Sequence, residues 1–317
     1  MRTGERALSL LSAPLNVHIL KALEEEERGL TDLTRAVGLP PASTMRSYLR
    51  SLVETGVLVR QREGGFPGGV SFALTPAGRG LLEVGKVLEQ WLREAPELPI
   101  SLGSTASKSA TKALIDGWSA NIVRALASRP MPLTKLDRLI PQVSYPTLER
   151  RLTAMRLVGL VEARRQGSGR GTPYSVTPWL RRAVATLVAA AAWESRYFAE
   201  APVERLDVEA SFLLAIPLLE LPPGLTGTCR LTIAMKVGAD PDHAGVTVAM
   251  EESRIASCVT RLDGEVDAWI AGSPTDWFCC MNGFEDSRID FGGDVCVGRG
   301  MMASLRELLM PLPARVR

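Results

Sequence analysis

The chain has 317 residues, 46% of them hydrophobic, with 37 basic against 35 acidic side chains. This length allows two or three domains, and the hydrophobic fraction excludes an intrinsically disordered chain. The best candidate for a membrane span, Ala183 to Trp193, has about half of the ~20 apolar residues required, and the N-terminus is unlike a signal peptide. We therefore expect a cytoplasmic protein without a membrane span.

The first 200 residues contain an internal repeat. Shifted by 103 positions, the segment from Ile19 to Arg62 coincides at eleven identical residues with the segment from Ile122 to Arg165. Beyond a Gly-rich loop the shift becomes 102, and Thr75-Pro76 falls on Thr177-Pro178. The repeat predicts two copies of one domain, because a length change is tolerated best in a loop.

Each copy predicts the same elements in chain order. Apolar spacing from Leu15 to Leu23 indicates a first helix, and Thr31 is placed to cap a short second one. A third helix has one apolar stripe, formed by Met45, Leu49 and Leu52 in the first copy and by Leu148, Leu152 and Met155 in the second.

The rest of each copy predicts a hairpin and a long last helix. Gly56 and Gly159 are placed to end the third helices, and Ser144 is placed to cap the third helix of the second copy. The predicted strands are 57–60 with 70–74, and 160–163 with 173–176. The last helices are expected to begin at the two Thr-Pro pairs, because proline is tolerated in the first turn.

Three helices, a hairpin and a fourth helix make a winged helix-turn-helix. The second copy resembles the HxlR family of bacterial regulators through Gly117-Trp118, LTKLDRLIPQVSYPTLERRLTAMRLVGLVEAR and YSVTPWLRR, and the first copy resembles HxlR or MarR winged helices. The resemblance implies operator DNA as a partner. Family members usually bind as homodimers, so we expect this tandem chain to imitate a dimer, and two chains to pair as a further possibility.

Candidate DNA-binding residues lie off the apolar stripes and on the wings, where a winged helix meets bases and phosphates. In the first copy they are Ser43, Thr44, Arg46, Ser47, Arg50, Arg60 and Arg62, and in the second Tyr145, Thr147, Arg150, Arg151, Arg164, Arg165 and Arg170. Arg46 and Arg150 lead the set, because the guanidinium fork suits guanine edges and phosphates. The alternatives are a solvated helix face and a protein-binding module.

Charge is uneven along the chain. Residues 1–95 have a net charge of +1, residues 96–200 of +8 and residues 201–317 of −7. The acidic run Glu24 to Glu27 belongs to the first copy. We therefore expect the second copy to bind DNA more strongly, with the first copy binding weakly or packing against its partner.

Residues 203–317 predict an antiparallel sheet with helices on one face, an α+β layer. Ser273 is placed to cap a helix there. The order DGEVDAWIAGSPTDWFCCMNG then RIDFGGDVCVGRGMMASLRELL resembles the sterol-carrier-protein family, which implies a tunnel for an apolar molecule or lipid. Aromatic and methionine side chains suit such a pocket, and the alternative is an ordinary core. The candidate ligand-binding residues are Trp269, Trp277, Phe278, Met281, Phe284, Met301 and Met302.

Catalytic and metal chemistry find little support. The five cysteines have no repeated spacing, the two histidines are far apart, and no nucleophile–base motif occurs. We expect no enzymatic activity, metal or cofactor.

The expected fold is thus mainly α with α+β: winged helix domains at 1–95 and 96–200, with a linker at about 96–110, and a sterol-carrier-like domain at 203–317. The expected function is DNA-binding transcriptional regulation. The tandem winged helices would act as an intramolecular pseudo-dimer, and the C-terminal domain would bind an apolar small-molecule or lipid effector. The alternative is a lipid-binding or assembly protein whose winged helices contact protein.

Overall fold

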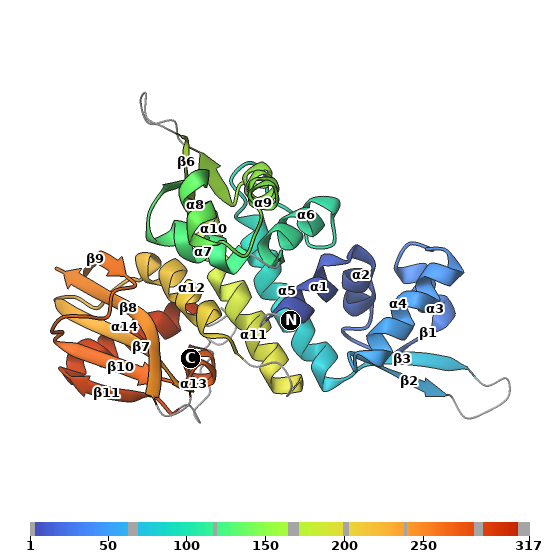
Figure 1. Cartoon of the computed structure of the whole chain (residues 1–317). Helices are drawn as coiled ribbons and strands as arrows, with labels where there is room; N and C mark the ends of the chain where they lie inside the picture. The colour runs from blue at the N-terminus through green and yellow to red at the C-terminus, as the bar shows by residue number, and fades with distance from the viewer. Residues whose placement is uncertain are drawn as a thin grey trace. The chain divides into compact units, whose positions relative to one another are not determined.

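The computed structural model describes residues 4–62, 69–116, 119–163, 171–198, 203–237, 240–281 and 288–309 (Figure 1). The chain divides into two compact units. One is Glu5–Lys112, and the other is Ala113–Arg317 together with Met1–Gly4. The first unit contains one winged helix, here called winged helix 1. The second contains the other, winged helix 2, together with a C-terminal sheet.

Winged helix 1 begins with two short helices, and the expected helix-turn-helix and wing come after them. Its elements are α1 (Glu5–Ser12), α2 (Pro14–Ala22), β1 (Arg28–Gly29), α3 (Leu30–Ala36), α4 (Ala42–Glu54), β2 (Leu58–Arg62), β3 (Val70–Leu74) and α5 (Pro76–Arg93). The strands form an antiparallel sheet in the order β1-β3-β2.

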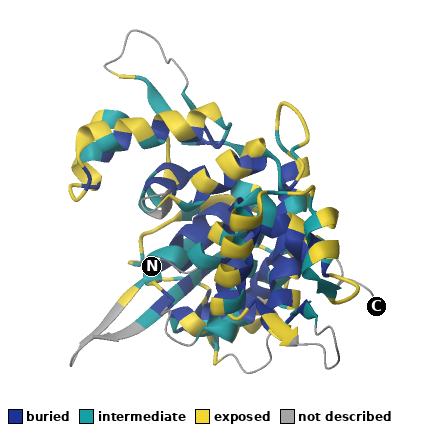
Figure 2. Cartoon of the chain, turned by 90° about the vertical axis from the view of Figure 1, so that its right-hand side faces the viewer, coloured by how far each residue is buried: buried dark blue, intermediate teal, exposed yellow. Residues whose placement is uncertain are grey.

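The apolar stripe of α4 holds this unit together. Met45, Leu49 and Leu52 are buried, as predicted, and Figure 2 shows the same division of helices into a buried and an exposed side. Gly56 follows α4 with a φ of +70°, the left-handed conformation that favours glycine at a helix end. Burial of the stripe fixes which side of α4 is left for solvent.

The first residues of α3 and α5 test two predicted helix starts. Thr75 caps α5, because its hydroxyl accepts the Gly78 amide at 3.1 Å. Gly78 is required there, since a Cβ would lie 2.3 Å from the Val57 carbonyl oxygen. The prediction for Thr31 is wrong: α3 begins at Leu30 after Gly29, so Thr31 lies inside the first turn.

Winged helix 2 repeats this arrangement after α6 (Thr105–Ile115). Its elements are α7 (Ser119–Ser128), β4 (Met131–Pro132), α8 (Leu133–Leu139), α9 (Tyr145–Leu157), β5 (Val161–Ala163), β6 (Pro173–Val176), α10 (Pro178–Arg182) and α11 (Val184–Tyr197). The sheet order β4-β6-β5 matches that of winged helix 1, and the stripe of Leu148, Leu152 and Met155 is buried. The duplication predicted from the repeat is therefore confirmed as two winged helices.

Two details differ from the prediction for this copy. The last helix is broken, because the Ala183 amide bonds to the Leu180 carbonyl three residues back and ends α10. After the break, α11 packs against the C-terminal helices. Ser144 occupies the N-cap of α9, but its hydroxyl lies 2.9 Å from that of Thr147 and makes no backbone cap bond.

The C-terminal part is an α+β layer. Its elements are α12 (Arg205–Ala215), the short 3₁₀ helix η1 (Ile216–Leu218), β7 (Gly227–Val237), β8 (Asp240–Glu251), β9 (Arg254–Val259), β10 (Ala268–Gly272), α13 (Pro274–Met281), β11 (Asp290–Gly293) and α14 (Val295–Leu309). The strand order is β11-β10-β7-β8-β9, with α12, α13 and α14 packed on one face. Ser273 caps α13 as predicted, with the Asp276 amide 3.1 Å from its hydroxyl.

The sheet is mixed rather than fully antiparallel as expected, because β10 runs parallel to β7. After β9 the chain crosses the outer face of the sheet. Thr247 and Arg230, which lie on that face, donate to the carbonyls of Arg261 and Gly264 at 2.6 Å. The crossing returns the chain to the far side of β7, and β10 then runs in the same direction as β7.

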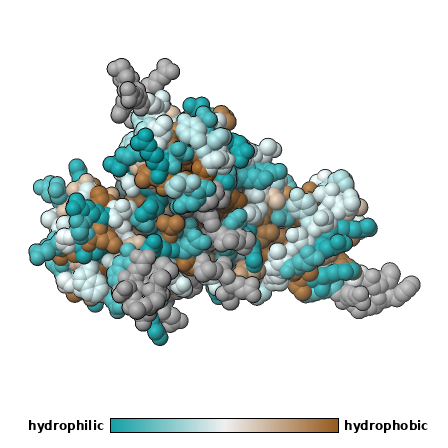
Figure 3. All heavy atoms as spheres, in the orientation of Figure 1, coloured by the Kyte–Doolittle hydropathy of each residue, from teal (hydrophilic) through white to brown (hydrophobic). Residues whose placement is uncertain are grey.

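No helix in the described ranges is long and apolar enough to cross a membrane. On the face shown in Figure 3, small hydrophobic patches alternate with hydrophilic side chains.

Candidate nucleic-acid interface

The solvent side of α4 carries most of the residues predicted for the first copy. Ser43, Arg46, Ser47 and Arg50 are exposed, whereas Thr44 is half-buried. Arg46 and Arg50 are four residues apart, so they lie one above the other on the same side of the helix. Burial of the apolar stripe thus presents two arginines outward together.

A groove runs between α4 and the wing strands β2 and β3. Its volume is about 480 Å³, and Arg46 and Arg50 line it from α4 while Arg60 lines it from β2. Leu49 and Phe72 contribute apolar surface. Helix and wing therefore direct three predicted arginines into one groove, although these residues are up to 14 positions apart in the sequence.

The charge of this groove is only partly balanced. Within the described ranges no ion pair engages Arg46, Arg50 or Arg60, and Glu54 is the one acidic residue of the groove lining.

The acidic run that follows α2 is already engaged elsewhere. Glu24 pairs with Lys86 at 3.1 Å and Glu26 with Arg28 at 3.2 Å. Hydrogen bonds that Lys86 donates to the Glu83 and Glu24 carboxylates raise the pKa of Lys86. These pairs offset part of the repulsion toward DNA that the run implied.

Winged helix 2 presents a different surface on α9. Tyr145 and Arg150 are exposed and Thr147 is half-buried. Arg151 does not share their surface: its guanidinium lies 3.1 Å from the Asp116 carboxylate, and its side chain is only 16% exposed. Arg151 is therefore an internal ion-pair partner, which corrects its placement among the DNA contacts.

The repeat allows the two grooves to be compared residue by residue. The positions equivalent to Arg46, Arg50 and Arg60 are Glu149, Thr153 and Ala163. Arg150 aligns instead with Ser47, on the neighbouring strip of the helix. The copy with the higher net charge thus lacks the arginines of the helix–wing groove, a difference that the sequence alignment contained and that total charge concealed.

Four wing residues of the predicted set are not placed. Arg164, Arg165 and Arg170 lie outside the described residues, and the side chain of Arg62 does as well. Their roles stay predictions.

The predicted ligand-binding residues do not line one site. Trp277, Phe278, Met281, Met301 and Met302 are buried under the sheet, whereas Trp269 is exposed on the opposite face, between buried Ala268 and Ile270. Trp269 is therefore separated from the others by the sheet itself, and Phe284 lies outside the described residues.

The buried members of that set pack as a core. The Trp277 ring meets Phe212 edge-on, with centroids 4.7 Å apart, and its indole N–H donates to the Thr232 carbonyl at 2.8 Å. The Cys280 and Met302 sulfur atoms are 3.4 Å apart. These contacts agree with the alternative of an ordinary core.

Two of the five cysteines, Cys229 and Cys258, have thiols that burial keeps neutral. Burial raises the pKa of Cys229 and of Cys258 to about 12, so both thiols stay protonated at neutral pH. Among the described residues no cluster of His, Cys, Asp and Glu could hold a metal ion.

Comparison with protein families identifies a helix-turn-helix in both copies independently. A model of the IclR helix-turn-helix domain matches residues 17–62, and a model of the HxlR-like helix-turn-helix matches residues 114–202. The chain carries two tandem helix-turn-helix domains. Such domains indicate a DNA-binding transcriptional regulator, of a kind typically without enzymatic activity. No curated protein matches the chain.

The two matches refine the expected resemblances. The HxlR resemblance of the second copy is confirmed, whereas the first copy matches IclR rather than HxlR or MarR. Neither match extends beyond residue 202, so the sterol-carrier resemblance of residues 203–317 stays a prediction.

Proposed function

We propose that this protein regulates transcription by binding DNA mainly through winged helix 1. The observation that carries the proposal is the groove in which α4 and the wing bring Arg46, Arg50 and Arg60 together. In winged helix-turn-helix domains the helix equivalent to α4 enters the major groove while the wing follows the backbone. One groove then supplies both kinds of contact.

The three arginines have different expected tasks. Arg46 lies in the N-terminal half of α4, the part of a recognition helix that reaches base edges, and its fork can bind guanine O6 and N7. Arg50 lies one turn further along, and Arg60 comes from the wing, so both are placed for phosphates. Ser43 and Ser47 complete the exposed strip.

Winged helix 2 supplies a weaker second contact in this account, through Tyr145 and Arg150. Arg46 aligns with Glu149 in the repeat, so the two copies present different side chains to the bases. An asymmetric site is therefore expected. As a pseudo-dimer the chain would contact half-sites about 34 Å apart, one turn of DNA. Residues 203–317 would act as the effector domain.

One observation favours the alternative for winged helix 2. Leu157, at the end of α9, is 78% exposed, and an exposed leucine suits a protein contact better than a phosphate backbone. In that case winged helix 2 holds a protein partner while winged helix 1 alone binds DNA.

The test is a selection of bound genomic fragments, followed by measurement of affinity for the selected site at two salt concentrations. We expect the affinity to fall steeply with salt, and Arg46→Gln to cost about 1–3 kcal/mol, roughly 5- to 150-fold. Arg60→Gln should make the salt dependence shallower by about one counterion. Arg93→Gln, on α5, is the control.

Two results would overturn the proposal: binding that is weak and indifferent to salt, or equal affinity of Arg46→Gln and Arg93→Gln. A stable protein partner together with salt-insensitive DNA binding would favour the assembly alternative for the whole chain.

A further inference from the structure

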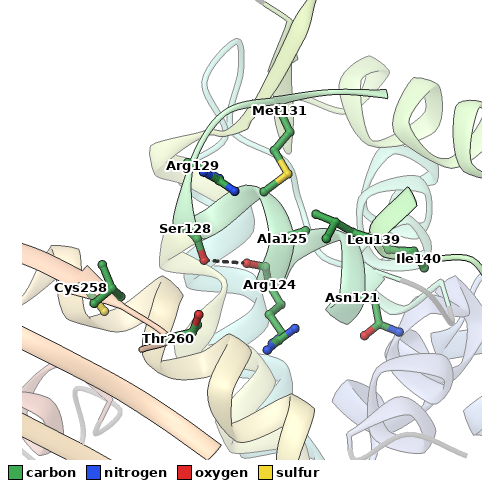
Figure 4. Close-up of a pocket in the computed structure, with 11 residues that line it drawn as sticks. Asn121, Arg124, Ala125, Ser128, Arg129, Met131, Leu139, Ile140, Cys258 and Thr260 are labelled. Atoms are coloured by element: carbon green, nitrogen blue, oxygen red, sulfur yellow. Dashed lines mark hydrogen bonds between the residues drawn. The ribbon is translucent and has the colours of Figure 1, made fainter. Parts of the chain in front are cut away.

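A second groove, within the unit Ala113–Arg317, lies between winged helix 2 and the edge strand β9 of the C-terminal sheet (Figure 4). Its volume is about 360 Å³, within the range of about 300–1,000 Å³ typical of small-molecule sites. Asn121, Arg124 and Arg129 come from α7 and the residue after it, and Cys258 and Thr260 face them from β9 and its end.

Opposite sides of the groove carry exposed hydrophobic side chains. Leu139, at the end of α8, is 54% exposed, and Val259, at the end of β9, is 45% exposed. Met131 and Ile140 extend the apolar surface inward. An apolar ligand between these walls would remove both exposed side chains from water.

The charge around the groove is positive. Its lining contains Arg124 and Arg129 and no acidic residue. Arg124 is neutralised by Glu209 of α12, with N–O distances of 2.8 and 3.1 Å, whereas within the described ranges no ion pair engages Arg129. The Asn121 amide also makes no hydrogen bond to another described residue.

A third positively charged side chain, Arg181, is buried near the groove. Arg181 donates to the carbonyls of Leu213 and Ala127 at 2.8 and 3.2 Å, and its burial lowers its pKa. It interacts electrostatically with Cys258, which lines the groove, but the raised pKa of that thiol leaves it neutral. The lining itself contains no acidic side chain that could cancel this positive charge.

We propose that this groove binds a carboxylate with an apolar body of medium length. The carboxylate would pair with Arg129 and accept from the Asn121 amide, while the apolar body lies between Leu139 and Val259. This inference rests on the proposed regulatory function in one respect: the groove would be the binding site of the regulator's effector. The site is distinct from the aromatic and methionine set predicted from the sequence.

The position of the groove explains how such a ligand would act. Leu139 ends α8, and α8 packs on α9, the helix predicted to contact DNA. On the other side β9 contacts η1, and η1 continues α12, which packs on α7. A ligand held between α8 and β9 therefore joins the sheet to winged helix 2 and can favour one arrangement of the two, provided its affinity differs between arrangements.

The test uses octanoate, octanamide and octylammonium as probes of equal chain length, titrated by calorimetry into the full chain without DNA. We expect octanoate to bind saturably with one molecule per chain, and the neutral and cationic probes to bind at least tenfold more weakly. Equal binding of octanoate and octanamide, or no saturable octanoate binding, would overturn the proposal.

Three variants locate the site. Arg129→Gln should weaken octanoate at least tenfold and leave octanamide unchanged, because only the charge is removed. Leu139→Asn should weaken both probes, and its exposure makes misfolding an inadequate explanation. Arg138→Gln, an exposed arginine of α8 outside the lining, is the charge control, and an equal loss in Arg138→Gln and Arg129→Gln would refute the assignment.

The two proposals fail separately. Loss of specific DNA binding in Arg46→Gln does not involve the probes, and octanoate binding is measured without DNA. If the chain binds octanoate but does not bind DNA specifically, the proposed function is overturned and the ligand site is retained.

Discussion

Winged helix 1 and winged helix 2 share a sheet order, a buried stripe on the third helix and a glycine in the left-handed conformation after it. They differ where DNA would lie. The first directs three arginines into its helix–wing groove, and the second has Glu149, Thr153 and Ala163 at those positions. The comparison teaches that the net charge of a domain does not show where its arginines lie, because position on the helix face decides what a charge can reach.

The two copies also differ in the compact unit to which each belongs. Winged helix 1 lies in a unit of its own, whereas winged helix 2 packs through α7, α10 and α11 on the helices of the C-terminal layer. The second copy can therefore be influenced by the sheet through these helices.

The largest expected effect comes from Trp277→Ala, which removes the centre of the C-terminal core. The ring is fully buried against Phe212, so we expect a loss of about 3–5 kcal/mol in the stability of the second unit and none in the first. Hydrogen exchange followed by mass spectrometry reads the peptides of each unit separately. A loss below about 1 kcal/mol would show that this space is a ligand cavity rather than a filled core.

The pair between Arg124 and Glu209 joins winged helix 2 to α12. Glu209 is 3% exposed and Arg124 is 41% exposed, so Glu209→Ala should cost the second unit about 2 kcal/mol, reduced by the solvent around Arg124. The control is Glu89→Ala, which breaks the more exposed pairs with Lys21 and Arg93 in the first unit and should cost about 0.5 kcal/mol. Equal costs would remove the distinction between an independent and a supported copy.

Much of this architecture could be predicted from the sequence. The repeat and the two stripes determined both winged helices, because burying an apolar stripe leaves few arrangements of three short helices. The parallel pairing of β10 with β7 could not be predicted, since it depends on a loop crossing the outer face through Arg230 and Thr247.

The candidate site was predictable only in part. The helix face of Arg46 and Arg50 followed from periodicity, but the inward turn of Arg151 depends on Asp116, 35 residues earlier in the chain. The separation of Trp269 from Trp277 required the register of β10. Charge totals do not show which residues share a surface, because they count residues without regard to position on the helix.

The helix caps that end the two hairpins should behave alike, since Thr75 and Thr177 occupy equivalent positions. Each accepts an amide of the following helix, from Gly78 at 3.1 Å and from Leu180 at 3.2 Å. We expect Thr75→Ala and Thr177→Ala to cost about 1 kcal/mol each in their own unit, and the serine variants to retain most of the stability. Denaturant unfolding measures both, and a twofold or greater difference would show that the duplication is not equivalent at this position.

The smallest expected effect concerns the turn before the recognition helix. Leu39 is largely exposed and has a φ of +54°, whereas its equivalent Gln142 does not have a positive φ. Asparagine tolerates the left-handed conformation better than leucine, so Leu39→Asn should stabilise the first unit by about 0.5 kcal/mol. Gln142→Asn should change nothing measurable, and a gain there would contradict the assigned turn geometry.

The central claim is that winged helix 1 holds the main DNA contacts, and one pair of matched variants tests it. Arg46→Gln/Arg50→Gln/Arg60→Gln and Arg138→Gln/Arg150→Gln/Arg156→Gln each remove three positive charges from one copy. The account predicts that the first triple variant binds the selected DNA site at least about 100-fold more weakly than the unchanged chain, and the second less than about tenfold. The reverse order, with the larger loss in winged helix 2, would contradict it.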